Sequence, residues 1–365
     1  MITSNDFKTT LEQLVWRHRK FSEALEMTRS FAAFSPPGSM ILVVGTSGAG
    51  KTTMLRQLQK ELAGPVESWP AGTIPIAAAP ICNDVQGLFS SKNFILRLLE
   101  AVVHPFYGVH QPLPFSPQED ESGPAPALEK IRLSYSEPHL RLALENAIFH
   151  RGTRYLLLDE AQHLLKTGSR QKAINNLDSI KCLAERTKIT VILFGTFEIL
   201  PIWNRSAQLN RRLQDVVLHR YRREDEADLI DFEQILESFS QLLPLAKGLS
   251  LRDLNEFIHD NTLGIIGEVN RLVVGAYSRM VATGAKAITK SMLRDAAHSY
   301  AKRITLERET FGGEQMLSGA PRPSATHVPA LKIQKKGKRC GQRHAIRDPT
   351  GGKHSVILRD DEQLP

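Results

Sequence analysis

A glycine-rich run of eight residues constrains this chain more than any other feature. It spans Gly45–Thr52, reads Gly-Thr-Ser-Gly-Ala-Gly-Lys-Thr and fits the spacing G-x-x-x-x-G-K-[ST]. The uniformly apolar Met40–Val44 before it predicts a buried strand, and a helical pattern over 51–63 follows it. A loop in this position cradles phosphate groups, because its backbone N–H groups turn inward and the helix N-terminus adds positive potential. The run therefore predicts a nucleotide site in an α/β fold.

The chemistry expected of this loop is the binding of ATP with Mg²⁺. Lys51 is placed to reach the β- and γ-phosphates, and the Thr52 hydroxyl is placed to coordinate the metal. The expected nucleotide contacts are those of Gly45, Thr46, Ser47, Gly48, Ala49, Gly50, Lys51, Thr52 and Thr53. A chance match is the alternative, but the strand and helix on either side argue against it.

An acidic pair follows a second apolar segment. Tyr155–Leu158 is fully apolar, and Asp159 and Glu160 come next. Ligands of open parallel sheets bind at the carboxyl ends of the strands. We therefore expect Asp159 to hold Mg²⁺, and Glu160 to orient and deprotonate the attacking water as a general base. A strand that ends in a solvated acidic turn is the alternative.

Polar residues further along the chain are candidates for contact with the γ-phosphate. Thr196 follows an apolar segment at 189–194, and it either lies between the two motifs or only caps the next turn. Arg211 and Arg212 precede a short apolar segment. One of them, supplied by a neighbouring subunit, would stabilise charge on the transferred phosphoryl group, unless both are solvated surface residues. Arg271 either reaches the γ-phosphate or pairs with Glu268 on the same helix.

The order of apolar runs and helical patterns predicts an α/β domain with a parallel sheet covered by helices, followed by a small helical lid. We expect an N-terminal helical segment over 1–38 and an ATP-binding domain over 39–224, with a proline-rich insertion at 104–127. The helical lid is expected over 225–312, with helices at 225–243, 251–259, 267–283 and 289–307. A flexible basic tail is expected over 313–365.

Charge is concentrated in that tail. The net charge is +8, and residues 318–365 contribute +6 from ten Lys/Arg and four Asp/Glu. Net charge is therefore weak evidence that the rest of the chain binds nucleic acid. Within the tail, residues 332–343 hold six cations and no acid, which fits a DNA tether, a docking peptide or a solubilising segment.

The sequence favours the cytoplasm as the location of this protein. No segment approaches the ~20 apolar residues of a membrane span, and the N-terminus lacks the pattern of a signal peptide. The three cysteines, Cys82, Cys182 and Cys340, lie far apart in the sequence, which is typical of free thiols in a reducing compartment.

Taken together, these motifs resemble those of the AAA+ ATPases. In that pattern Thr196 matches sensor 1, Arg211 and Arg212 the arginine-finger region, and Arg271 sensor 2, although Thr196 stands where many AAA+ proteins have Asn. The words GTSGAGKTT, LLLDEAQHLL and ILFGT and the Arg-Arg pair are similar to those of the TniB/TnsC family of transposition regulators, over roughly 35–300. This resemblance implies an ATP-dependent homo-oligomer, a ring or a helical filament, on double-stranded DNA. It also implies a transposase and a target-selector protein as partners.

The sequence leaves two other functions possible and does not identify the residues that contact DNA. The same fold serves replication-type helicase loaders or initiators, and also signalling or secretion ATPases that do not act on DNA. The candidates for DNA contact, each of which is otherwise a solvated surface charge, are Lys130, Arg132, Lys166, Arg170 and Lys172.

Overall fold

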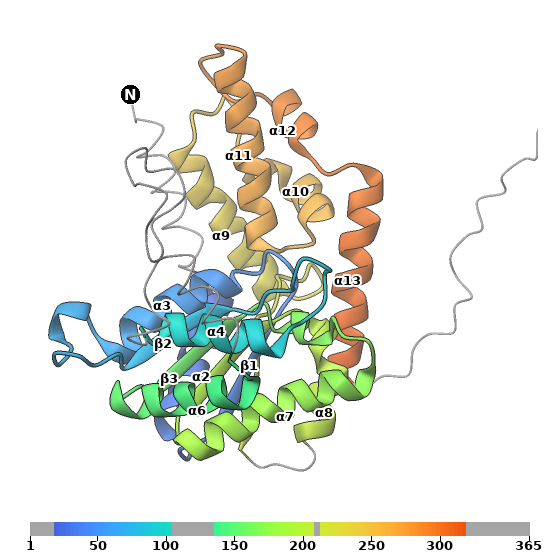
Figure 1. Cartoon of the computed structure of the whole chain (residues 1–365). Coiled ribbons are helices and arrows are strands. Elements are labelled where there is room, and N and C mark those ends of the chain that lie inside the picture. The colour runs from blue at the N-terminus through green and yellow to red at the C-terminus, as the bar shows by residue number, and fades with distance from the viewer. Residues whose placement is uncertain (1–17, 104–134, 208–211, 319–365) are drawn as a thin grey trace, which may run out of the picture. The chain divides into compact units, whose positions relative to one another are not determined.

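The computed structural model describes residues 18–103, 135–207 and 212–318 (Figure 1). Several sequence expectations therefore lie outside the described residues. These are the start of the N-terminal segment, the insertion at 104–127, Lys130, Arg132, Arg211 and the tail from residue 319 onward.

Five parallel strands form one sheet in the order β2–β3–β4–β1–β5. They are β1 Met40–Val44, β2 Ile76–Pro80, β3 Tyr155–Asp159, β4 Thr190–Gly195 and β5 Leu213–Val217. The predicted parallel α/β fold is confirmed. Strand β4 lies between β1, which precedes the phosphate loop, and β3, which ends at Asp159. Because all strands run the same way, the segments that follow β1, β3 and β4 meet at one edge of the sheet.

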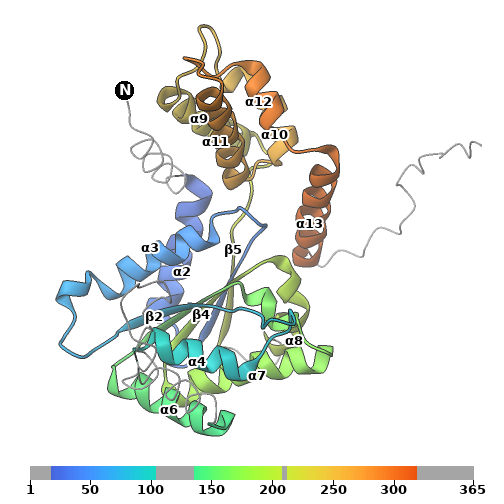
Figure 2. The same ribbon diagram turned by 45° about the horizontal axis from the view of Figure 1, so that its top comes forward.

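Helices cover both faces of this sheet (Figure 2). Met40, Leu42 and Val44 of β1 share a hydrophobic core with α4, α6 and α7, whereas Ile41 and Val43 share one with α2 and α3. This alternation follows from the two-residue period of a strand, and the burial of both faces explains why the strands are continuously apolar. The α-helices here are α2 Arg19–Phe34, α3 Lys51–Ala63, α4 Ser91–Ala101, α6 Glu137–His150, α7 Arg170–Thr187 and α8 Leu200–Ala207, and the 3₁₀ turns are η1 Val66–Ser68, η2 Ala161–Leu165 and η3 Phe197–Ile199.

A separate helical region with its own core follows β5. Its buried residues include Phe232, Leu236 and Val269. The elements that contribute to this core are α9 Glu226–Leu242, η4 Arg252–Leu254, α10 Asn255–Thr262, α11 Ile266–Ala282 and α12 Lys290–Ala296. In the part of the chain that the structure describes, no helix has the length and apolarity needed to cross a membrane. Cys82 and Cys182 are free thiols.

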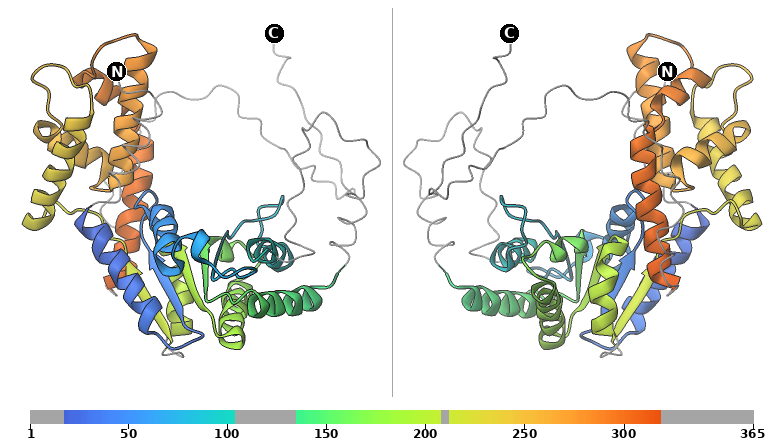
Figure 3. Two further views of the ribbon diagram at one scale, coloured as in Figure 1. Left: turned by 90° about the vertical axis from the view of Figure 1, so that its left-hand side faces the viewer. Right: turned by 90° about the vertical axis from the view of Figure 1, so that its right-hand side faces the viewer.

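The single helix expected over 289–307 is wrong, because two helices occupy that region. Helix α12 ends at Ala296, and α13 runs over Tyr300–Ser318. The break occurs without Gly or Pro because side chains from α11 satisfy the last carbonyl groups of α12: Arg279 donates to Asp295 O at 2.6 Å and Arg271 to Ala296 O at 3.1 Å. Helix α13 also continues past Gly312, so the boundary expected at residue 313 lies inside a helix (Figure 3).

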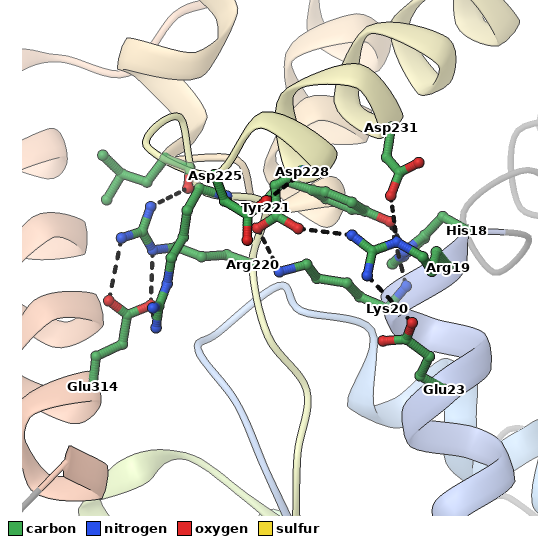
Figure 4. A network of polar contacts seen from close by, with 12 residues as sticks. His18, Arg19, Lys20, Glu23, Arg220, Tyr221, Asp225, Asp228, Asp231 and Glu314 are labelled. Carbon is green, nitrogen blue, oxygen red and sulfur yellow. Dashed lines mark hydrogen bonds and ion pairs between the residues drawn. The ribbon is translucent and has the colours of Figure 1, made fainter.

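An ionic network joins the start of α2 to the segment that leads into α9 (Figure 4). Asp228 is buried and accepts hydrogen bonds from Lys20, from Arg19 at 2.8 Å and from the backbone N–H of Arg222 at 2.9 Å. The buried His18 contacts the Tyr221 hydroxyl at 3.0 Å. Helix α2 is therefore tied both to the sheet, through its apolar face, and to the helical region, through its first turn.

Candidate functional site

The phosphate loop joins β1 to α3, and its conformation favours glycine at three positions, Gly45, Gly48 and Gly50. Gly50 caps α3 in the left-handed region, with φ of 100°, which residues with a Cβ rarely adopt. A Cβ on Gly45 would lie 2.9 Å from the carbonyl oxygen of Leu218, closer than such atoms approach. The glycines of the sequence motif therefore permit a tight turn packed directly against the segment after β5.

Lys51 begins α3 and is buried in the loop. Its Nζ donates to the carbonyl oxygens of Gly45 at 2.9 Å and of Thr46 at 2.7 Å. Burial lowers the pKa of Lys51 to about 8, although the negative charges of Glu160 and Asp159 act in the opposite direction. Both hydrogen-bond partners are neutral, so a phosphate oxygen would bind this ammonium group more strongly than they do.

The structure brings Thr52 and Asp159 together, as the two motifs predicted. The Thr52 hydroxyl donates to Oδ2 of Asp159 at 2.7 Å, although 107 residues separate the two in sequence. Asp159 is buried at the end of β3. Hydroxyl and carboxylate oxygens are the donors that Mg²⁺ prefers. This pair therefore fits a magnesium ion beside the phosphate loop.

Glu160 lies one residue beyond the sheet in an unusual backbone conformation. Its φ of 60° and ψ of 40° are left-handed, which costs free energy for any residue except glycine. Its backbone N–H donates to Oδ1 of Asp159 at 2.9 Å, and its carboxylate accepts a hydrogen bond from Nε2 of Gln162. The two acidic side chains therefore diverge, with Asp159 toward Thr52 and Glu160 toward Gln162.

Thr196 follows β4 and lies at the same edge of the sheet. Its backbone N–H donates to Oε1 of Gln162 at 3.1 Å, so Gln162 links it to Glu160. Its hydroxyl oxygen is buried and forms no hydrogen bond within the described part of the chain. Gln162 is not among the site residues that the sequence predicts, and its one sequence signal is its place in the motif Asp-Glu-Ala-Gln-His.

Arg271 forms the ion pair that the sequence offered as the alternative to a phosphate contact. Its Nε donates to Oε2 of Glu268 at 2.7 Å, and His298 contacts the same oxygen at 2.7 Å. One guanidinium nitrogen, Nη2, is buried and forms no hydrogen bond with described residues. Arg271 is therefore held by the helical region, one turn beyond the N-terminus of α11.

Arg212 does not lie near the phosphate loop of its own chain. Its carbonyl oxygen accepts a hydrogen bond from the backbone N–H of Met40, at the start of β1, whereas the phosphate loop follows the end of that strand. β1 has five residues, so its two ends lie roughly 13 Å apart. Arg212 is therefore placed at the opposite edge of the sheet from Lys51.

Comparison with known proteins gives one match to a family and several to solved structures. Residues 37–203 match the family model described as AAA domain. No curated protein matches this chain. A Walker-type ATPase of Pyrococcus abyssi is 14% identical, with 82% of this chain and 76% of that chain covered and a TM-score of 0.47.

Two further solved structures are similar at the same low level. The RuvB Holliday junction branch migration motor of Thermotoga maritima is 12% identical, with 81% of this chain and 68% of that chain covered and a TM-score of 0.38. Cdc6p from Pyrobaculum aerophilum is 15% identical, with 70% and 59% covered and a TM-score of 0.44. The family match rests on the residues that contain the phosphate loop, the acidic pair and Thr196. Residues 37–203 therefore match an AAA domain within a P-loop fold, and this match supports ATPase activity.

Proposed function

We propose that this chain is an ATP-dependent, DNA-binding AAA+ regulator of transposition, similar to the TniB/TnsC family. It assembles as a homo-oligomer, a ring or a helical filament, on double-stranded DNA, and it recruits and activates a transposase where a target-selector protein directs it. One observation carries this proposal. The exposed cations Lys166, Arg170 and Lys172 lie 6 to 12 residues after Glu160, and we assign them to a DNA-facing segment that begins just after η2.

The nucleotide-binding residues have separate tasks in this function. Lys51 binds the β- and γ-phosphates in place of its two carbonyl partners, and Thr52 and Asp159 hold Mg²⁺. The metal neutralises charge on the phosphate oxygens when it is bound. Glu160 orients the attacking water and accepts its proton. Thr196 offers its unpartnered hydroxyl to that water or to the γ-phosphate.

Arginines complete the site across a subunit boundary. The place of Arg212, at the far edge of the sheet from its own phosphate loop, supports action on a neighbouring subunit. Arg211, its neighbour in sequence, is the other candidate for this finger. Arg271 turns from Glu268 toward the γ-phosphate when the lid closes. ATP binding thereby links one subunit to the next and drives oligomerisation.

The proposed DNA-facing segment is anchored rather than loose. The carbonyl oxygen of Lys166 accepts a hydrogen bond of 2.6 Å from the backbone N–H of Phe89, in the turn that precedes α4. Among the described residues, neither Lys166 nor Lys172 forms an ion pair. Unpaired, exposed lysines on a fixed backbone suit contacts with phosphate groups, which carry affinity without sequence preference.

The assignment of the site is tested by two variants. We expect Glu160→Gln to bind ATP normally but to release phosphate at a small fraction of the normal rate, because an amide cannot accept the proton. Lys51→Ala should bind ATP poorly. The measurements are nucleotide affinity and steady-state phosphate release, and normal turnover in Glu160→Gln would refute the role of the general base.

The trans arrangement of the arginines calls for a mixing experiment. A double variant, Arg211→Ala/Arg212→Ala, should bind ATP yet hydrolyse it slowly. Mixing it with Lys51→Ala protein should restore part of the activity, because each variant supplies what the other lacks. If the double variant hydrolyses ATP at the normal rate, or if the mixture is no more active than its two components, the arginine finger lies elsewhere.

DNA binding is tested by salt dependence and a matched charge control. We expect ATP-dependent binding to unrelated duplexes with similar affinity. Lys166→Ala/Lys172→Ala should flatten the slope of log affinity against log salt by about 2, one unit for each lost phosphate contact. Lys60→Ala/Lys247→Ala removes the same charge from exposed positions elsewhere and should leave the slope unchanged.

Recruitment of a transposase is tested in a pull-down with the protein assembled on DNA. A transposase, taken from a gene beside this one, should be retained only with duplex DNA and an ATP analogue. Binding that is indifferent to nucleotide, or turnover and assembly that are indifferent to DNA, would contradict the proposal. The second of these results would favour an ATPase that does not act on DNA.

A further inference from the structure

We infer that Gln162 is a positioning residue for ATP hydrolysis. It fixes the Glu160 carboxylate relative to the backbone at the end of β4. The inference rests on the proposed role of Glu160 as the general base. Gln162 is the second residue of η2, directly after the acidic pair. Nothing in its sequence position requires a glutamine for folding, because its side chain is only partly buried.

The amide of Gln162 bridges the ends of two neighbouring strands. Its Nε2 donates to Oε2 of Glu160, just beyond β3, and its Oε1 accepts from the backbone N–H of Thr196 at 3.1 Å, just beyond β4. The orientation of the amide is fixed chemically. The Thr196 N–H can only donate, so the amide oxygen must face it and the NH₂ group must face the carboxylate.

Only an amide of this length satisfies both partners. A carboxylate at position 162 has no hydrogen to donate to Glu160, and a lysine has no acceptor for Thr196. Asparagine is one methylene shorter. Gly195 leaves the space for this bridge, since a Cβ there would lie 3.3 Å from Oε1 of Gln162 and 3.2 Å from the Cβ of Ala161.

The bridge has a direct consequence for catalysis. Glu160 is exposed, and its side chain is otherwise free to rotate away from the attacking water. Strand β4 lies beside β1, which leads into the phosphate loop, so Thr196 is a fixed reference for the bound phosphates. A base misplaced by about 1 Å costs up to about 100-fold in rate. The bridge therefore acts on the rate of hydrolysis rather than on nucleotide binding.

The test compares full-length Gln162→Ala and Gln162→Glu with Gln241→Ala as the matched control. Gln162→Glu keeps the acceptor for Thr196 but loses the donor to Glu160. Both Gln162 variants should lower kcat at least about tenfold, with KM and ADP affinity within about twofold of the normal protein because the phosphate loop is untouched. Gln241 lies exposed on α9, away from the phosphate loop and from the proposed DNA-facing segment, so its variant should be normal.

A double-variant cycle shows whether Gln162 acts through Glu160. In the Glu160→Gln background, single-turnover hydrolysis should not fall further when Gln162→Ala is added, because the positioned group has already been removed. The inference would be overturned if Gln162→Ala lowered the rate by the same factor in the Glu160→Gln background as in the normal protein. A normal kcat in both Gln162→Ala and Gln162→Glu would also overturn it. Normal ADP binding and thermal melting of each variant exclude misfolding as the cause. Normal hydrolysis by Glu160→Gln alone would instead refute the proposed base, so the two failures are distinguishable.

Discussion

The backbone N–H of Gly267, in the first turn of α11, donates a hydrogen bond of 3.1 Å to the carbonyl oxygen of Gly48 in the phosphate loop. The helical region therefore rests directly on the loop. A Cβ on Gly267 would lie 2.1 Å from that oxygen, well inside contact distance. Only glycine permits this approach, so the position of α11 and the conformation of the phosphate loop are linked.

We expect Gly267→Ala to weaken nucleotide binding. The added methyl group must push α11 away from Gly48, and overpacking of this kind costs about 1–3 kcal/mol. This cost destabilises the conformation in which α11 rests on the phosphate loop, which is the conformation that we expect to bind ADP. Affinity for ADP should therefore drop about tenfold, since 1.4 kcal/mol is a factor of ten. Titration with a fluorescent ADP analogue measures the change.

The matched control for this prediction is Gly312→Ala. A Cβ at position 312 meets no atom within 4 Å, and Gly312 also lies in a helix. That variant should bind ADP with normal affinity. Equal affinities in Gly267→Ala and the control would show that the contact between α11 and the loop does not support nucleotide binding.

The buried ammonium group of Lys51 predicts an unusual pH dependence of stability. Its pKa is lowered from 10.5 to about 8 in the folded chain. Between these two values the unfolded chain holds a proton that the folded chain lacks, so stability rises with pH across this window. Below about pH 8 both states are protonated, and burial of the charge costs on the order of 3 kcal/mol.

Replacement of Lys51 with an apolar residue of similar length should remove this cost. We expect Lys51→Met to raise the melting temperature of nucleotide-free protein at neutral pH while it abolishes ATP binding. The gain should shrink as pH rises from about 8 to about 10.5, because the normal protein is then relieved of the charge as well. Thermal melts across this range give the result. A variant that is less stable at neutral pH would show that the bonds to the two carbonyl groups outweigh desolvation.

The fold and the meeting of the two motif segments were predictable because both depend on local patterns. The strand at Met40–Val44 and the helix at Lys51–Ala63 have the predicted ends, since an apolar run and a Gly-Pro stop determine them. The contact between Thr52 and Asp159 followed from the rule that parallel strands present their carboxyl ends at one edge.

Features that depend on distant contacts were not predictable. The bridge made by Gln162 needs the Thr196 N–H, which is 34 residues away in sequence and comes close only because β3 and β4 are neighbours in the sheet. The break between α12 and α13 has no Gly or Pro signal, and it depends on Arg271 and Arg279 of another helix. For Arg271, sequence left both the phosphate contact and the ion pair open, and in this structure the side chain pairs with Glu268.

The ionic network at the start of α2 predicts which acidic residue stabilises the fold. Burial alone would raise the pKa of Asp228, but hydrogen bonds from Lys20 and from the Arg222 backbone outweigh it, and the pKa is lowered. Asp228→Ala leaves these donors without their anion and should cost about 3 kcal/mol of unfolding free energy. Asp231→Ala, which removes a more exposed partner of Arg19, should cost under about 1 kcal/mol.

Acidification provides a second test of the contribution of Asp228 to stability. Because the folded pKa of Asp228 lies below its ordinary value of 3.8, its contribution is present above that value and is lost as pH falls through the lowered pKa. Urea denaturation should therefore give unfolding free energies for the normal protein and for Asp228→Ala that converge as the pH falls below 3.8. A constant difference between the two proteins at all pH values would contradict the ionic origin of the stabilisation.

Two adjacent glycines in α13 give the last prediction, because their surroundings differ. A Cβ on Gly313 would lie 2.0 Å from the Phe197 ring and 2.7 Å from the Phe197 Cβ, whereas a Cβ on Gly312 would meet nothing. Gly312→Ala should therefore stabilise the protein by about 0.5–1 kcal/mol through helix propensity. Gly313→Ala should destabilise it by about 1–3 kcal/mol, since α13 must move away from η3.

The same displacement should reach the nucleotide site, because Phe197 directly follows Thr196. Movement of η3 shifts the Thr196 N–H, which anchors Gln162 and through it Glu160. We therefore expect Gly313→Ala to lower kcat for ATP hydrolysis with little change in ADP affinity. Thermal melts and phosphate release on both variants provide the test. Equal melting temperatures in the two variants would show that α13 does not depend on close contact with Phe197, and a normal kcat in a destabilised Gly313→Ala would show that η3 moves independently of the catalytic residues.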